Sequence, residues 1–226
     1  AFLSGALMFT SMLSATFDSA VGTVLDGTDA VVRPGEGQGS LSREEADEIA
    51  AHPDVARTNI FAEKSIVAAR EDEEAIQTQM GGSRVSVYYG AQDSVGAPTE
   101  LTAGHAPDAL GEAVVNANGA EHYGITLGQH LIAVDKDGRH DIIVTGVYDD
   151  ALSQKTSLQF RVSPETYTEF YTRGDTVPAL TVAAERVGDE AIVEKLRTAH
   201  PDLKIATGTS VAEETSAQIR EALSFV

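Results

Sequence analysis

Residues 111–150, GEAVVNANGAEHYGITLGQHLIAVDKDGRHDIIVTGVYDD, form the stretch of this chain that most restricts its fold. The apolar run 112–116 predicts a strand. The small residues of 116–123 predict about two helical turns, ended by Gly124 in the left-handed cap conformation. Aliphatic and β-branched runs at 131–134 and 142–147 predict two further strands, and the Asp-Gly turn between them predicts a hairpin. We therefore expect residues 127–150 to form a small barrel-like sheet element.

The chain before this stretch alternates strands with a helix. Residues 29–33 predict a strand, and Ser42 with Glu45 three positions later has the capping-box spacing of a helix over 43–51. His52-Pro53 ends that helix. The next expected elements are one long strand or two over 55–69, a strand over 85–89, and a loop over 95–107 that contains several glycines and prolines.

The chain after it has the same character. A strand is expected over 158–162, followed by a helix that begins with Pro164 at its first position and runs to about Tyr171. A strand over 179–184, a helix over 189–199 ended by His200-Pro201, and a strand over 203–207 complete the region.

An internal repeat suggests how these elements are grouped. The order helix, His-Pro-Asp, strand occurs at residues 52–54 and again at 200–202, each time after a strand. Two βαβ units from opposite parts of a chain can form one ferredoxin-like layer. We therefore predict an α+β fold with a discontinuous ferredoxin-like, porter-like subdomain (26–68 and 175–210) and an inserted mostly-β subdomain (69–174).

Both ends of the chain are apolar. Residues 1–17 carry no charge, and Phe9, Leu13, Phe17, Ala20 and Val24 recur at helical spacing. We interpret 1–25 as a stalk helix that leaves a first membrane span, and 211–226, with its stripe of Val211, Thr215, Ile219, Ala222 and Leu223, as a stalk helix leading to a second. The alternatives are a signal-peptide remnant or an amphipathic helix packed on the domain at the first end, and an ordinary helix at the second.

The composition excludes some partners. Sixteen basic and thirty-five acidic residues give a net charge of −19, which repels the phosphates of nucleic acids and of anionic lipids. With no cysteine, the chain has neither disulfides nor thiolate metal sites. At 226 residues and 42% hydrophobic composition it is long enough to bury a core.

Sequence signatures of catalysis are missing. The chain has no Gly-Lys dipeptide and hence no P-loop, and it has neither G-x-S-x-G nor S-x-x-K. The glycine-rich residues 35–39 lack the last glycine of a dinucleotide fingerprint and are expected to form a flexible loop. We expect no catalytic residues, no cofactor and no metal.

Several polar groups were weighed as sites and given simpler roles. His52 and His200 are expected to end helices, whereas a metal or haem site shared by His122, His130 and His140 is the less favoured alternative. Asp135, Asp137 and Asp141 lack the pattern of a calcium loop, and the hairpin turn explains Asp137-Gly138. The remaining candidates are assigned to solvated surface (Asp149-Asp150 and Glu213-Glu214) and to buried cross-strand packing, with a contact surface as the alternative (Tyr88, Tyr89, Tyr148, Tyr167 and Tyr171).

Four segments carry a resemblance to a known family. In order along the chain, these segments are "GEAVVN", "HYGITLGQ", "IIVTGVYDD" and the ending "AQIREALSFV". They resemble the extracytoplasmic domain of MacB/FtsX-like ABC transporter permeases, the MacB-like periplasmic core domain. The order and spacing of these segments extend over nearly the whole chain. The family resembled is built from a porter-like part with an inserted β-rich part.

The resemblance implies a function without chemistry in this domain. It implies a bacterial permease that forms a homodimer in the cell membrane, with this domain on the extracytoplasmic face and ATP hydrolysis in a separate cytoplasmic subunit. The stalks would carry motion outward, for export or for mechanical signalling to an exported substrate or an envelope protein. The alternative is a freestanding secreted module that binds a ligand or a protein; an envelope hydrolase has only scattered acids in its favour.

Overall fold

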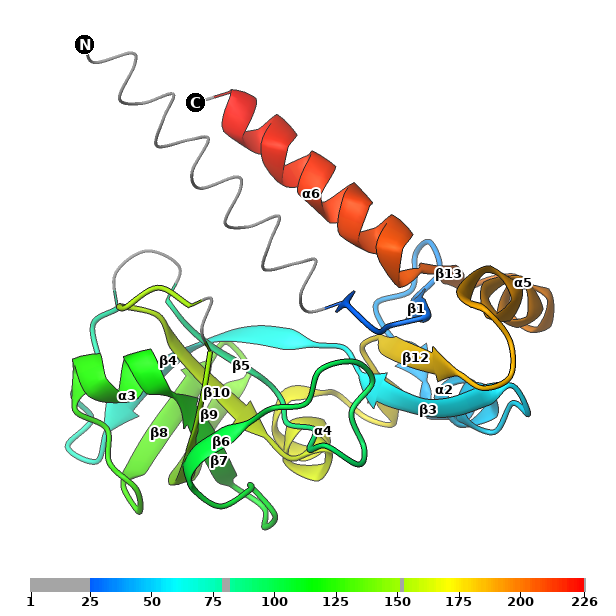
Figure 1. The fold of residues 1–226 in the computed structure, drawn as a ribbon. Coiled ribbons are helices and arrows are strands. Elements are labelled where there is room, and N and C mark those ends of the chain that lie inside the picture. Colours follow the sequence, from blue (N-terminus) through cyan, green and yellow to red (C-terminus); the bar gives the residue numbers. More distant parts are fainter. Residues whose placement is uncertain (1–24, 79–81, 151–152, 226) are drawn as a thin grey trace. The chain divides into compact units, whose positions relative to one another are not determined.

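A computed structural model describes residues 25–78, 82–150 and 153–225 (Figure 1). Apart from Leu25, the first predicted stalk (1–25) lies outside these residues. The described chain contains helices and strands in alternation, so the predicted α+β class is confirmed. It divides into two compact units. Unit 1 comprises 25–59, 94–97 and 179–225, and unit 2 comprises 60–93 and 98–178.

The elements of unit 1 are two well-packed helices, one long C-terminal helix and five strands. They are β1 (Ala30–Arg33), β2 (Leu41–Ser42), α2 (Arg43–Ala50), β3 (Val55–Ile60), β12 (Leu180–Ala184), α5 (Asp189–Ala199), β13 (Lys204–Thr207) and α6 (Gly208–Ser224). The last residue of β3, Ile60, already belongs to unit 2.

The sheet of unit 1 has the strand order β13-β1-β12-β3. β1 pairs antiparallel with both of its neighbours. It is fully buried at Ala30, Val31 and Val32, as expected for a short apolar strand in the middle of a sheet. The buried residues of α2 are Ala46 and Ile49, and those of α5 are Ile192, Val193 and Leu196. Each helix is thus amphipathic and contributes one apolar stripe to the core.

The repeated His-Pro motif ends α2 and α5, as predicted. The ring Nδ1 of His52 accepts a hydrogen bond from the Asp54 N–H (3.1 Å). His200 is the C-cap of α5, and its N–H donates to the carbonyl oxygen of Leu196 (2.8 Å). At the other end of α2, Ser42 and Glu45 form the predicted capping box.

The elements of unit 2 are two short helices and eight strands. They are β4 (Glu63–Arg70), β5 (Ser83–Val87), β6 (Leu101–Gly104), β7 (Glu112–Asn116), α3 (Ala117–Tyr123), β8 (His130–Asp135), β9 (Gly138–Tyr148), β10 (Leu158–Val162), α4 (Pro164–Tyr171) and β11 (Thr176–Val177).

Seven of these strands form one sheet that closes on itself. The strand order is β6-β9-β7-β10-β5-β4-β8, and β9 also pairs with β8. Six strands therefore form a ring, with β6 added outside it on β9. The interior is filled by apolar side chains such as Leu131, Val144 and Phe160, and Tyr167 and Tyr171 of α4 join this core. The barrel-like element predicted for 127–150 is one part of this ring.

The structure selects one of two alternatives for residues 55–69 and corrects the loop expected at 95–107. Residues 55–69 form two strands in different units, because β4 pairs with β5 and β8 in unit 2. Unit 2 begins at Ile60, and the insertion expected from the sequence is 69–174. Residues 95–107, expected as a loop, contain β6, which pairs with β9 across a register shift. The sequence of β6, Leu-Thr-Ala-Gly, is too short to establish a strand period and is not buried, so only its distant partner defines it as a strand.

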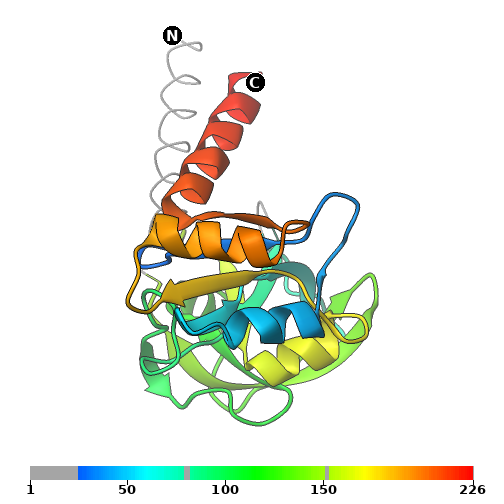
Figure 2. The ribbon, with the colours of Figure 1, turned by 90° about the vertical axis from the view of Figure 1, so that its right-hand side faces the viewer.

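The last helix begins earlier than predicted. α6 starts at Gly208 because the Thr207 side chain caps it by accepting a hydrogen bond from the Ser210 N–H (3.1 Å). Val211 and Ser216 are its buried residues beyond the first turn, and Figure 2 shows α6 running away from the rest of unit 1. In the described chain, no helix is both long and apolar enough for a membrane crossing.

Candidate functional site

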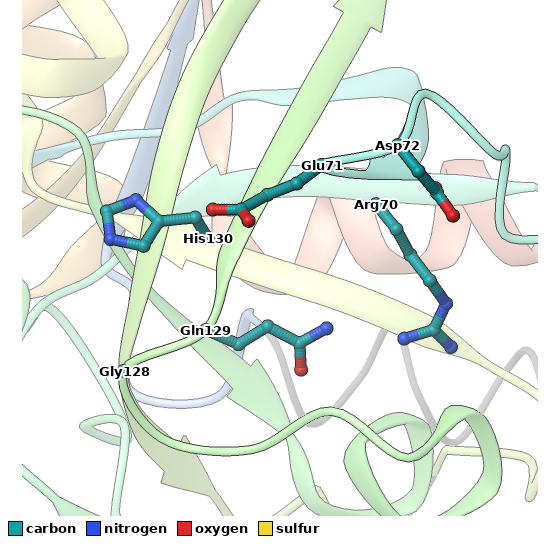
Figure 3. Close-up of a pocket in the computed structure, with 6 residues that line it drawn as sticks. All are labelled: Arg70, Glu71, Asp72, Gly128, Gln129 and His130. Carbon is teal, nitrogen blue, oxygen red and sulfur yellow. The ribbon is translucent and has the colours of Figure 1, made fainter.

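An open pocket lies where β4 ends and β8 begins. Its cavity volume is about 490 Å³, and it is lined by Arg70, Glu71, Asp72, Gly128, Gln129 and His130. Two of the lining side chains form hydrogen bonds with backbone groups. Arg70 donates to the carbonyl oxygen of Tyr123 (2.7 Å), and Gln129 accepts from the Thr126 N–H (3.0 Å). Figure 3 shows the Glu71 carboxylate turned toward His130. The pocket mixes both signs of charge and holds no serine, threonine or cysteine that could act as a nucleophile.

The acids of the β8–β9 hairpin are neutralised by neighbouring cations. Lys64 Nζ lies 3.1 Å from Asp135 Oδ2 and 3.1 Å from Asp137 Oδ2, and Arg173 also contacts Asp137. The hydrogen bond from Arg173, together with that from Lys64, holds the pKa of Asp137 below its usual value. Asp135 Oδ1 accepts the N–H groups of Asp137 and Gly138 and so builds the turn. These contacts give the acids a role in the hairpin, as the sequence suggested.

The histidines weighed as a shared metal site contact aromatic rings or line the pocket. The His122 ring meets the Tyr123 ring edge-on, with centroids 4.7 Å apart. His140 stacks on Phe170, with centroids 4.3 Å apart. His130 lines the open pocket. Within the described residues, no group of three His, Asp or Glu side chains is placed to hold a metal ion.

Three of the five tyrosines considered are buried in unit 2. Tyr148, Tyr167 and Tyr171 are at most 7% exposed. Burial raises the pKa of Tyr148 and of Tyr167 to about 12 and raises that of Tyr171 as well. These three rings therefore serve packing, as the sequence interpretation favoured. Tyr88 and Tyr89 remain partly exposed.

The start of the first strand and the end of the last strand of unit 1 lie side by side. Ala30 at the start of β1 lies opposite Thr207 at the end of β13. The first residue of α6, Gly208, packs so closely on Thr28 that an added Cβ would overlap the Thr28 carbonyl oxygen. We call residues 25–28 together with Gly208 the stalk root. Sequence reasoning did not identify it, because no local pattern reports a close backbone contact between residues 180 positions apart.

Comparisons with known proteins identify the fold. No family model and no curated protein sequence matches the chain. Among solved structures, the periplasmic region of MacB from Actinobacillus actinomycetemcomitans superposes with a TM-score of 0.58 at 14% identity, covering 84% of this chain and 94% of that one. The extracellular domain of the ABC-type transporter YknZ from Gram-positive bacteria gives 0.53 at 12% identity, covering 78% and 97%. The chain therefore has the fold of these two transporter domains, which is the fold that the sequence resemblance predicted.

Proposed function

We propose that this chain is the extracytoplasmic domain of a bacterial ABC transporter permease and that it transmits motion without catalysing a reaction. The observation that carries this proposal is the fold shared with MacB and YknZ over most of both chains. ATP hydrolysis belongs to a separate cytoplasmic subunit, and a second copy of the permease completes the assembly in the cell membrane. The output is export of a substrate or a mechanical signal to an envelope protein.

In this proposal, unit 1 is the ferredoxin-like, porter-like part and unit 2 is the inserted part. The strand order β13-β1-β12-β3 supports the assignment, because two βαβ units that interleave in one antiparallel layer produce this order. Helices α2 and α5 connect β1 to β3 and β12 to β13, as that topology requires. The insertion occupies the connection between β3 and β12.

The register of unit 1 supports a lever that is driven from one end. Ala30 and Thr207 are opposite each other, so both connections toward the proposed membrane helices leave from the same end of adjacent strands. The Glu185 N–H donates to the Asp54 carbonyl oxygen (2.7 Å), which places the end of β12 beside the start of β3. Because β12 is antiparallel to β1, the end of β12 and the start of β3 lie at the same end of the sheet as Ala30. The insertion leaves after β3 and returns before β12, so it connects to the other end of this short sheet. By the route through the sheet, a displacement of the stalks would pass from β1 to β12 before it reached the insertion.

The proposal is tested with the protein expressed in its native host from its complete gene, carrying an affinity tag. We expect the tagged protein in the membrane fraction, protease-accessible from outside the cytoplasm, and co-purifying with a P-loop ATPase in mild detergent. A separate pull-down of two differently tagged copies tests the homodimer. Recovery of the tagged protein as a free secreted species without an ATPase would reject the proposal in favour of the secreted binding module.

A further inference from the structure

Residues Ser94–Ala97 form a short segment of the inserted region that belongs to unit 1, whereas its neighbours Asp93 and Pro98 belong to unit 2. The segment is a closed turn, in which Ser94 Oγ donates to the carbonyl oxygen of Ala97 (3.2 Å). Ser94 and Val95 are buried. The chain thus leaves unit 2 for four residues only, of which the first two are buried and the last, Ala97, is exposed.

This segment contacts both the end of β3 and the stalk root. The Val95 N–H donates to the side-chain oxygen of Asn59 (2.7 Å), and Asn59 is itself buried. Gly96 lies against Gly27, and a Cβ added to Gly96 would overlap the carbonyl oxygen of Asp26. Both glycines have positive φ angles (77° and 80°), which side chains other than glycine rarely adopt. Two backbones therefore approach closely at the same turn, residues 25–28, that Gly208 of α6 contacts.

The segment is also fixed in unit 2 immediately after it ends. The Thr99 N–H donates to the Tyr89 carbonyl oxygen (3.0 Å), and Thr99 Oγ1 accepts from the Arg161 guanidinium (2.5 Å). That guanidinium lies over the buried Tyr148 ring, 4.4 Å from its centroid. Ala97 and Thr99 are separated by one proline, which has a restricted φ angle. Pro98 alone therefore connects the segment to Thr99.

From these contacts we propose that Ser94–Ala97 is a tie that couples the stalk root to unit 2, in addition to the two main connections of the insertion. A displacement of residues 25–28 or of Gly208 would pull on Gly96 and, through Pro98, on Thr99. The role of the tie rests on the proposed function, in which it is a route by which stalk motion reaches the inserted unit. Its existence is tested on the isolated chain and does not depend on transport.

The test is hydrogen–deuterium exchange of the purified chain with Thr99→Val, which replaces one hydroxyl by a methyl group and removes the Arg161 contact. We expect exchange at residues 25–30 and 208–212 to become several-fold faster, although Thr99 lies in the other unit. The matched control is Thr102→Val, which removes a hydroxyl bond from Thr102 to the Val147 carbonyl oxygen on β9 (3.3 Å). This control is expected to leave the exchange of the stalk root unchanged.

A second variant releases the tie from its other side. Asn59→Ala removes the acceptor for the Val95 N–H and is expected to accelerate exchange at 94–97 and at the stalk root. Faster exchange confined to residues 88–100 in Thr99→Val would overturn the proposal. Uniformly faster exchange throughout both units would also overturn it, because that pattern reports lost global stability. If Thr99→Val accelerates exchange at the stalk root as expected but no ATPase co-purifies with the protein from cells, only the proposed function is contradicted and the tie stands.

Discussion

The guanidinium of Arg33, at the end of β1, lies 3.2 Å from the carboxylate of Glu214 on α6. This ion pair joins the central strand of unit 1 to the second turn of its longest helix. Together with the close contact of Gly208 on Thr28 and the buried side chain of Val211, it fixes the direction in which α6 leaves the sheet. The proposed stalk is thus held at three points within its first seven residues.

Glu214→Ala is expected to destabilise unit 1 only slightly. Both side chains are partly exposed (33% and 49%), so the pair contributes about 0.5 kcal/mol, and salt screens it. Urea unfolding at low and at high ionic strength measures this, and the difference from the wild type should shrink at high salt. Glu213→Ala, at the exposed neighbouring position, is the control. An equal effect of both variants would mean that helix composition, and not the pair, is responsible.

Gly208→Ala is expected to lower the free energy of unfolding much more than Glu214→Ala does. An added Cβ would overlap the Thr28 carbonyl oxygen, so the helix start or the 25–28 turn must move, at a cost of about 1–3 kcal/mol. Chemical denaturation of the purified chain gives the value. The control is Gly39→Ala, where nothing lies within 4 Å of the added atom. Full stability of Gly208→Ala would show that the stalk root is not tightly packed.

The buried tyrosines predict a loss of stability in alkali. The pKa of Tyr148 is about 12 in the folded chain, against a usual value of 10.0. The unfolded chain therefore loses this proton first, and the stabilisation, fully present below pH 10, is lost as the pH rises toward 12. The shift corresponds to roughly 2–3 kcal/mol. Denaturant unfolding between pH 9 and about 12 should show a shallower decline in Tyr148→Phe than in the wild type, and identical pH slopes would contradict this reading.

The hairpin acids predict the opposite dependence in acid. The pKa of Asp137 is held below its usual 3.8 by Arg173 and Lys64. Its contribution is thus present above the usual pKa and is lost as the pH falls through the lowered folded value. Asp137→Asn should lower stability near neutral pH and flatten the acid limb of the unfolding curve. Asp141→Asn, at an exposed position of β9, removes the same charge and serves as the control. An equal loss of stability near neutral pH in both variants would show that the charge change, and not the contacts of Asp137, is responsible.

Much of the local structure was predictable because it depends on neighbours in sequence. The Ser42–Glu45 capping box joins residues three positions apart, and Pro164 and Gly124 mark a helix start and a helix end through their own backbone preferences. The two His-Pro helix ends and the β8–β9 hairpin belong to the same class. The α+β character and the order of most elements follow from these signals.

The contacts of the stalk root and of the Ser94–Ala97 tie were less predictable, because the residues that make them are far apart in the sequence. Asn59 meets Val95 across 36 positions, and Thr99 meets Arg161 across 62. Neither pair leaves a periodicity or a motif in the sequence. In the sequence, Gly27 and Gly96 resemble ordinary loop glycines. Only the structure shows that their backbones lie against each other.

By itself, the sequence determined most helix ends, the start of α6 excepted, as well as which segments are apolar enough to be strands and which catalytic motifs the chain lacks, because these properties depend on short-range hydrogen bonding and on composition. The tertiary structure alone decided that β4 belongs to unit 2, that β6 is a strand, that β8 closes the ring by pairing with β4, and that Ser94–Ala97 returns to the stalk root. Strand pairing and backbone contact are satisfied by partners far away in the chain, and only folding determines which partners meet.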